Sequence, residues 1–528
     1  METFDIIVIG GGSGGCASAA RLAEDAGLAV CLLEAGGENE TAAVNTPGML
    51  ALNLRKGKAN WGFDTVPQKG LGGRKGYQPR GKGLGGSSAI NAMLYLRGNS
   101  WDYDNWAAMG CTGWAWDDVL PWFRKTEANE RGESPFHGGS GPLSVTDQHW
   151  PNPASMAFLE AAESLQHAAN PDFNGAVQDG FGLYQVTQKH GERWSAARAF
   201  LAPKPNLTVR TGVRVENIVI ENHRATGVRI TAKGKTETLH ARGGVVLSGG
   251  TFASPQLLML SGIGPGAQLQ QHGISVLHES AEVGEGLQDH VDFVGSWMTR
   301  SRDPIGFTFS GALTMLRAFA EYRRSRSGMM TSPMAEAGGF WRSRADLPAP
   351  DVQFHFVPAV LEDHGRKLVW GYGISCHACV VRPESRGSVR LASARASDAP
   401  LIDPGFLNDP RDMAVLRSGV RQMHRIIAAP ALSSLGLTDR YPVNLDDDAA
   451  LDTLIRSRAD TIYHPVGTCR MGGDAASVVD PKLRVRGIDG LWVADASVMP
   501  KLISGNTNAP TIMIGERAAG FVREHLRG

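Results

Sequence analysis

Residues 4–15 read FDIIVIGGGSGG, a short apolar run followed directly by glycines. An apolar run of this length is typical of a buried parallel strand, and the glycines contain the pattern G-x-G-x-x-G. The next residues, from Cys16 to about Ala26, are mostly small and favour a helix that packs closely on a sheet. Free amides at the start of such a helix bind phosphate groups. The stretch therefore predicts a diphosphate cradle.

A second apolar run, residues 29–33, ends in Glu34. A carboxylate at this point of a nucleotide-binding βαβ unit binds a ribose hydroxyl and repels a 2′-phosphate. Strand, glycines, helix, strand and acid in this order favour a dinucleotide site over a glycine-rich turn without a ligand. Residues 11–15 also fit G-x-S-x-G, the hydrolase nucleophile elbow. We reject that interpretation because only one strand precedes Ser13, whereas an elbow follows the strands that hold its oxyanion hole.

The composition excludes several classes of protein. Lys plus Arg and Asp plus Glu each number 53 in 528 residues, so no net charge recruits nucleic acid or an anionic membrane. The acidic N-terminus does not resemble an export signal, and no apolar run is long enough to span a bilayer. Six scattered cysteines suit a reducing compartment, and the C-x-x-C pair Cys376 and Cys379 lies in a predicted strand, so we expect no metal site. We expect a cytoplasmic protein, with peripheral attachment to the inner face of the membrane left open.

A second informative stretch, residues 79–98, reads PRGKGLGGSSAINAMLYLRG. Glycines, serines and apolar helix formers in this order present free amides and hydroxyls to a polar ligand, or begin a capped helix. This stretch resembles the first signature of the glucose-methanol-choline (GMC) oxidoreductases, FAD enzymes that oxidise alcohols. Residues 250–264, GTFASPQLLMLSGIG, resemble the second signature of the family, and residues 463–472, YHPVGTCRMG, resemble its catalytic histidine segment.

The resemblance implies an α/β fold, α+β overall, with a Rossmann-like FAD-binding domain and an interleaved substrate domain built on an antiparallel sheet. Alternating hydrophobicity in residues 351–357 and 387–391 supports antiparallel strands with one exposed face. Residues 303–325 are interpreted as a loop and a helix that lie over the active site. The expected FAD-binding segments are 1–155, 201–295 and 455–528, and the expected substrate-domain segments are 156–200 and 296–454.

The resemblance also assigns the chemistry. Removing a hydroxyl proton helps an alcohol to release its α-hydride, and a histidine is a suitable base because its ordinary pKa, about 6.5, is close to working pH. His464 is the candidate base. Asn506 aligns with a second catalytic position, where it would hold the substrate oxygen; Asn508 is an alternative for that role, and each asparagine also fits a helix cap. We interpret His290, His355 and His377 as structural.

The family pattern assigns FAD binding to a larger set of residues. Val215 would contact the adenine through its backbone, and Asp495 would lie beside the ribityl and diphosphate part. The helix of residues 512–526 would face the flavin pyrimidine with its positive end. Ile90 stands where some choline oxidases have the histidine that binds FAD covalently, so we expect noncovalent FAD. The predicted cofactor residues are Gly10, Gly12, Ser13, Gly15, Glu34, Ala35, Gly83, Gly86, Ser87, Asn91, Ala92, Met93, Leu94, Val215, Tyr463, Asp495, Ala496, Asn508 and Thr511.

Residues 77–98 look most like the choline-dehydrogenase-like branch of the family. The leading hypothesis is oxidation of a primary alcohol to the aldehyde by hydride transfer to flavin N5, with electrons passed to a quinone or another carrier. One alternative is an oxidase that uses O2 and makes H2O2, like the aryl-alcohol and hydroxymethylfurfural oxidases. Two others, from different classes, are an FAD-containing hydroxynitrile lyase and an FAD-bearing protein without catalysis.

Overall fold

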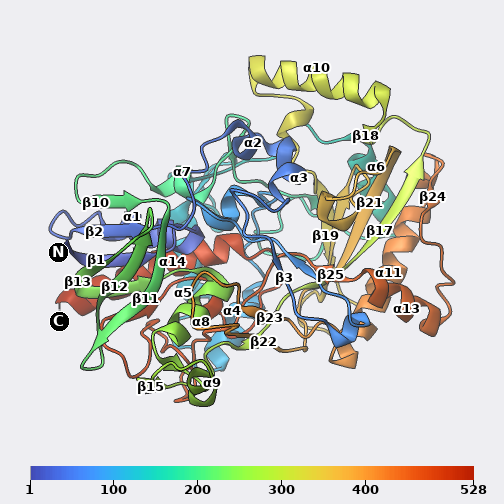
Figure 1. The fold of residues 1–528 in the computed structure, drawn as a ribbon. Helices are drawn as coiled ribbons and strands as arrows, with labels where there is room; N and C mark the ends of the chain where they lie inside the picture. Colours follow the sequence, from blue (N-terminus) through green and yellow to red (C-terminus); the bar gives the residue numbers. More distant parts are fainter. Residues whose placement is uncertain (1, 528) are drawn as a thin grey trace.

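The computed structural model describes residues 2–527, so Met1 and Gly528, the outermost residues of the predicted segments, lie outside the described residues. A seven-stranded sheet near the N-terminus has the order β10-β2-β1-β13-β12-β11, with β26 beside β13 (Figure 1). Pairings from β10 to β13, and between β13 and β26, are parallel, and the β11–β12 hairpin adds antiparallel strands. The strands are β1 (Thr3–Ile9), β2 (Val30–Leu33), β10 (Leu207–Arg210), β11 (Val213–Glu221), β12 (Arg224–Ala232), β13 (Lys235–Leu247) and β26 (Leu491–Val493).

Two helices that are far apart in the sequence pack against each other beside this sheet, α1 (Ser13–Leu22) and α14 (Asn508–Arg527). Their backbones approach so closely that a Cβ atom on Gly515 would lie 2.3 Å from the Gly14 carbonyl oxygen. The Ser18 hydroxyl donates a hydrogen bond to the Gly515 carbonyl at 3.0 Å. The small residues of the first helix are thus required by this contact. The helix begins three residues earlier than predicted, directly after Gly12, so it includes Gly14 and Gly15, and it ends before the turn that contains Gly27.

The second sheet has eight strands, all of them paired antiparallel, in the order β24-β17-β21-β20-β19-β7, with β18 beside β21 and β25 beside β17. Helices α6 (Pro153–Ser164) and α11 (Pro410–Ala428) pack on it, and the Phe158 and Phe356 rings stack 4.8 Å apart. The predicted combination of a Rossmann-like sheet and an antiparallel sheet is confirmed. The strands are β7 (Gly180–Leu183), β17 (Val291–Thr299), β18 (Gly306–Phe307), β19 (Ala337–Trp341), β20 (Val352–Val357), β21 (Gly371–Val380), β24 (Thr438–Asp439) and β25 (Asp460–Thr461).

The remaining elements connect or cover these sheets. The helices are α2 (Ala42–Asn45), α3 (Leu50–Asn53), α4 (Ser100–Ala108), α5 (Trp116–Thr126), α7 (Ala196–Phe200), α8 (Gly250–Leu260), α9 (Gly266–Gln271), α10 (Phe309–Ser325), α12 (Pro430–Ser433) and α13 (Asp448–Arg458). The 3-10 turns are η1 (Pro47–Met49), η2 (Lys69–Leu71), η3 (Gly86–Ala89), η4 (Met329–Thr331), η5 (Asp363–Gly365) and η6 (Ala496–Val498). The short strands are β3 (Phe63–Asp64), β4 (Tyr77–Gln78), β5 (Glu127–Asn129), β6 (Leu143–Val145), β8 (Gln188–Lys189), β9 (Glu192–Arg193), β14 (Ile263–Gly264), β15 (His278–Glu279), β16 (Glu285–Leu287), β22 (Gly387–Arg390) and β23 (Leu401–Asp403).

The two sheets draw on alternating parts of the chain. The predicted boundary at residues 155/156 falls inside α6, and the boundary at 295/296 falls inside β17. The division into domains therefore stays a prediction. No helix within residues 2–527 is both long enough and apolar enough to cross a bilayer.

Two local expectations are wrong. The 3-10 turn η3 ends at Ala89, and the apolar residues after it do not continue as a helix, because Met93 has a φ of 62° and Tyr95 donates its backbone N–H to the Gln185 carbonyl. Helix α10, expected over the active site, stands apart at one end of the molecule (Figure 1). It packs on η4, and none of its residues lines the cavity described below.

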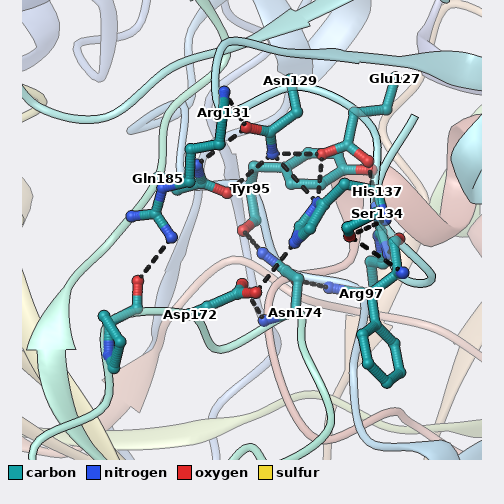
Figure 2. A network of polar contacts seen from close by, with 12 residues as sticks. Tyr95, Arg97, Glu127, Asn129, Arg131, Ser134, His137, Asp172, Asn174 and Gln185 are labelled. Atoms are coloured by element: carbon teal, nitrogen blue, oxygen red, sulfur yellow. Dashed lines mark hydrogen bonds and ion pairs between the residues drawn. The ribbon is translucent and has the colours of Figure 1, made fainter. Parts of the chain in front are cut away.

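A buried polar network holds the chain just beyond Met93 (Figure 2). The Arg97 guanidinium and the Glu127 carboxylate form an ion pair, and both side chains are fully buried. The His137 ring hydrogen-bonds Glu127 through Nδ1 and Asp172 through Nε2, each at 2.9 Å. Burial opposes a charge on the His137 ring, but the two carboxylates raise its pKa to about 9. The network joins segments that surround positions 95, 130 and 172 and so fixes the chain beside the cavity.

Candidate active site

A cavity of about 670 Å³ lies where the parallel strands of the first sheet end. Its lining includes Ile9 and Leu33, the last residues of β1 and β2, and the turns that follow β13 and β26. Ligands of open α/β sheets bind at these carboxyl ends. All of the predicted site residues except Gly15 and Gly83 line the cavity. The sequence motifs, which are spread over almost 500 positions, therefore meet at one place.

The first glycine turn forms a cradle of backbone. Gly12 is the N-cap residue of α1 and has no side chain to bond the first amides of the helix. A Cβ atom on Gly12 would meet no protein atom within 4 Å. A Cβ on Gly14 would lie 2.1 Å from the Ala494 carbonyl oxygen, and one on Gly15 would lie 1.9 Å from that of Gly10. Gly12 thus leaves room for a ligand beside the first amides of α1, whereas Gly14 and Gly15 permit the packing that holds the turn in place.

Glu34 ties three glycine segments together. One carboxylate oxygen accepts the backbone N–H of Gly11 at 2.8 Å, and the other accepts those of Gly36 at 2.7 Å and Gly83 at 2.8 Å. Gly83 therefore acts on the cavity through Glu34 and not by contact. The carboxylate also lines the cavity, and the oxygen that accepts only the Gly11 N–H has one lone pair left for a hydroxyl group.

Two more helices begin at the cavity. Asp495 accepts the Gly250 N–H at the start of α8 at 2.9 Å, the Ser254 hydroxyl at 2.6 Å and the Ser497 N–H at 2.8 Å. Asn508 begins α14 and accepts a 2.7 Å hydrogen bond from the Ser13 hydroxyl. Its side chain therefore bonds a residue of the glycine turn, whereas the sequence suggested that it could cap a helix. Helices α1, α8 and α14 all point their positive ends at the cavity, an arrangement that favours an anionic ligand.

A pair of hydrogen-bonded histidines, His290 and His464, lies at the opposite wall of the cavity. His290 Nε2 lies 3.0 Å from the Val381 carbonyl oxygen and 3.1 Å from that of Ile503, so it must carry the proton. His290 Nδ1 is then an acceptor, and His464 Nδ1, 2.9 Å away, must donate to it. A neutral His464 consequently has its lone pair on Nε2. No residue among 2–527 hydrogen-bonds that atom, and His464 lines the cavity.

The surroundings of these histidines keep them neutral. Burial lowers the pKa of His290 to about 3, and burial followed by the nearby His290, His355 and Arg80 lowers the pKa of His464 well below its ordinary value. Asp289 accepts the His464 backbone N–H at 3.0 Å. Burial raises the pKa of Asp289 to about 6. The wall thus offers an unprotonated imidazole in a position fixed by neighbouring backbone and side chains.

The second sheet adds side chains that the sequence interpretation left out. His355 on β20 and His377 on β21 line the cavity, and neither ring nitrogen of His355 has a well-aligned partner in the described chain. Asn506 lies close enough to oppose the lowering of the His355 pKa that burial causes, and its oxygen accepts a 3.2 Å bond from Gln353. His377 Nδ1 lies 2.6 Å from Asp292 Oδ2. Alternating polar residues in a buried strand, VQFHFV, were the signal that could have revealed this wall.

The comparisons with known proteins agree with this geometry. Sequence models of the GMC oxidoreductases match residues 4–292 (N-terminal part) and 383–515 (C-terminal part). The chain belongs to the GMC oxidoreductase family. It is 46% identical to "Alcohol dehydrogenase [acceptor]" of Pseudomonas putida over 98% of this chain and 95% of that protein. It is 39% identical to the mitochondrial choline dehydrogenase of Homo sapiens over 99% of this chain and 90% of that protein.

Among solved structures, a formate oxidase of Aspergillus oryzae with a mutation that affects FAD modification superposes with a TM-score of 0.93. It is 28% identical and covers 100% of this chain and 99% of that chain. GMC oxidoreductases are FAD-dependent enzymes, and the cavity fits this cofactor. Its glycine turn leaves room beside the amides of α1, Glu34 has one lone pair left for a hydroxyl group, and three helix starts favour a diphosphate.

Other interpretations of these motifs fail on the structure. The Ser13 hydroxyl bonds the Asn508 side chain and not a histidine, so the G-x-S-x-G pattern lacks the base that a nucleophile requires. Cys376 and Cys379 lie in β21 as predicted, and both are free and buried. Burial raises the pKa of both thiols, which keeps them protonated and unreactive.

Proposed function

We propose that this GMC oxidoreductase oxidises a primary alcohol to the aldehyde, with His464 as the base that takes the hydroxyl proton. The observation that supports this role most directly is the hydrogen bond between His464 Nδ1 and His290 Nδ1, which leaves the lone pair of a cavity-lining imidazole on Nε2. FAD, when bound, supplies the hydride acceptor. A base that takes the hydroxyl proton makes the carbon-bound hydrogen a better hydride donor.

Asn506 is the proposed partner of His464. An amide does not act as a base, but it can hold the substrate oxygen and so orient the hydrogen that leaves. From the sequence alone, Asn508 was an alternative candidate for this role. The Asn508 side chain bonds Ser13 at the glycine turn, whereas the Asn506 side chain lies beside His355 and bonds Gln353. Asn506 is favoured because it belongs to the wall that holds the histidines.

The proposed FAD contacts are the predicted residues that line the cavity, with Glu34 on the ribose, the α1 amides on the diphosphate and Asp495 beside the ribityl and diphosphate part. Gly15 and Gly83 support these contacts from behind. Ile90 is buried at the cavity and has no group that could attach to the cofactor, so the FAD is held noncovalently. The start of α14 stabilises negative charge that develops on reduction.

For the electron acceptor we favour a quinone or another carrier. The similar Pseudomonas putida protein is named an alcohol dehydrogenase, and its name leaves the electron acceptor unspecified. This supports a dehydrogenase. The similar formate oxidase supports O2 as the alternative, with H2O2 as product. We place the protein in a reducing compartment such as the cytoplasm, because its six cysteines are free and buried.

An anaerobic titration of the yellow holoprotein with a panel of primary alcohols tests the proposal, followed by admission of air and then of a quinone. We expect bleaching by at least one alcohol and return of colour only with the quinone. Return of colour in air with H2O2 would make the protein an oxidase. No bleaching by any alcohol would contradict the proposed oxidation and favour a hydroxynitrile lyase, which leaves the flavin oxidised.

A further inference from the structure

A cluster of exposed apolar side chains lies on and beside α10, and none of its members lines the cavity. Phe309 is 87% exposed, Leu316 is 69% exposed and Trp370 is 64% exposed. The Phe309 and Trp370 rings pack edge to face with centroids 5.1 Å apart. The cluster, which we name the α10 patch, consists of Phe307, Phe309, Leu313, Leu316, Leu368 and Trp370. A soluble surface rarely gathers so many large apolar groups without a binding partner.

Helix α10 has two apolar faces. The inner face, with Ala318 and Tyr322, packs on Met330 of η4. At about 100° per residue, Phe309, Leu313 and Leu316 fall within an arc of about 60° on the other side of the helix. The outer face therefore does not contribute to the folded core. In Figure 1 the helix projects from one end of the molecule, beyond α2 and α3.

Arginines flank this outer face. Arg317 and Arg324 lie on one side of the apolar arc and Arg323 lies on the other, and all three are exposed. None of these three makes an ion pair within the part of the chain that the structure describes. Residues 300–326 hold six arginines but only two acids, Asp303 and Glu321, although the whole chain has no net charge. The charge of the protein is thus locally positive where its exposed apolar surface is concentrated.

We propose that the α10 patch docks the protein on an anionic lipid surface, with the helix lying in the plane of the interface. An apolar stripe flanked by long basic side chains is the pattern of such helices: the stripe enters the boundary of the acyl chains while the guanidinium groups reach the phosphates. Aromatic residues such as Trp370 and Phe309 are favoured at the same depth. A second copy of the chain would present the same positive charges to this patch, which disfavours self-association here.

The position of the patch gives docking a consequence for the active site. Gly48 of η1 lies against Met330 of η4, under α10, and α3 follows directly with Leu50, which lines the cavity. Leu52 on the outer side of α3 is 50% exposed. The docked surface therefore borders the segment that covers the cavity. An apolar alcohol or acceptor dissolved in the lipid would reach the cavity at this border.

Co-sedimentation of the holoprotein with vesicles tests the proposal. We expect binding to vesicles of phosphatidylcholine with phosphatidylglycerol, and weaker binding at high ionic strength or to phosphatidylcholine alone. Phe309→Ser with Leu316→Ser and Trp370→Ser should lower the partition coefficient at least tenfold. The control, Val177→Ser with Leu277→Ser, removes exposed apolar groups elsewhere and should bind as the wild type.

A charge variant tests the electrostatic part. Arg317→Gln with Arg323→Gln and Arg324→Gln should lower binding by about 100-fold at low salt, because each basic residue near an anionic surface contributes about a factor of five. Arg229→Gln with Arg344→Gln and Arg395→Gln, exposed elsewhere, should bind as the wild type. Turnover of a water-soluble alcohol with a soluble dye should be unchanged in all variants, which shows that each is folded.

A fluorescent label reports which face enters the lipid. The six native cysteines are free and buried, so a thiol dye on Leu316→Cys labels one site. Its emission should rise and shift to the blue on addition of anionic vesicles, and a dye on Val177→Cys should not respond. Failure of the wild type to bind, or equal binding by the patch variant, would overturn the proposal. A dimer in light scattering that the patch variant abolishes, without vesicle binding, would assign the patch to self-association instead.

Discussion

The two walls of the cavity differ in the chemical groups that they contain. The cofactor wall consists of the glycine turn after β1, the 83–88 loop and the starts of three helices, and it presents backbone amides with few side chains. The opposite wall includes His464, His355 and His377 together with Asn506, which carry imidazole and amide side chains. We therefore expect added atoms to disrupt packing and FAD binding at the first wall. At the second wall we expect the loss of a side-chain group to lower the rate of the reaction.

The largest expected effect comes from removing the base. His464→Gln keeps a side chain of similar polarity but cannot take a proton, so we expect kcat to fall by about 10²- to 10⁴-fold. FAD content, read from the absorbance of the purified protein, should be unchanged. An unchanged kcat would show that the opposite wall does not act through this imidazole.

Adding one methyl group to the cofactor wall tests the other half of the comparison. Gly15→Ala places a Cβ 1.9 Å from the Gly10 carbonyl oxygen, which should cost about 1–3 kcal/mol of folding stability and lower Tm. Gly12→Ala is the matched control in the same turn, because its Cβ meets no protein atom. We expect Gly12→Ala to fold normally but to lose FAD on gel filtration. Equal stability of the two variants would contradict the packing role given to Gly15.

Removing the hydrogen-bond acceptor of His464 tests how that wall is positioned. His290→Phe leaves His464 Nδ1 without its partner, so the ring can adopt the other tautomer. We expect kcat to fall by about 10- to 100-fold, as for other groups that orient a reactive imidazole. His290→Asn, which retains an acceptor, should recover part of the loss. A merely structural role would lower Tm in both variants without a difference in kcat between them.

A smaller effect is expected in the buried network beside the cavity. The pKa of His137 is raised to about 9, so its contribution to stability is complete below the unfolded value of about 6.5 and is lost as pH rises through 9. The change amounts to ~3 kcal/mol. In His137→Gln, the fall of Tm between pH 6.5 and 9 should become shallower than in the wild type. Parallel Tm curves would show that His137 is neutral in the folded protein.

The same difference between the walls explains what the sequence could predict. The cofactor wall follows from local patterns, because the spacing of glycines in residues 10–15 and 83–88 determines where backbone can approach a ligand. All of its predicted residues lie in or directly behind the cavity, although Glu34 proved also to bind three backbone amides. Their contacts with FAD remain predictions.

The opposite wall could not be predicted in the same way, because it depends on strand pairing between distant segments. His355 and His377 face each other across the β20–β21 ladder, and only this register brings both to the cavity. The role of His290 depends on two carbonyl groups from residues 381 and 503, which no local pattern connects. The position of α10 likewise depends on packing against η4, so the sequence predicted a helix in residues 303–325 but not where that helix lies.

The most direct test of the central claim is the pH dependence of the second-order rate constant for anaerobic reduction of bound FAD by an alcohol. Because burial and the nearby His290, His355 and Arg80 lower the pKa of His464 well below its ordinary value, the proposed base is already unprotonated at neutral pH. The account predicts a rate constant that is level from about pH 6.5 upward and falls only in more acidic solution. A rate constant that still rises between pH 7 and 9 would show that the base is protonated at neutral pH and would contradict the account.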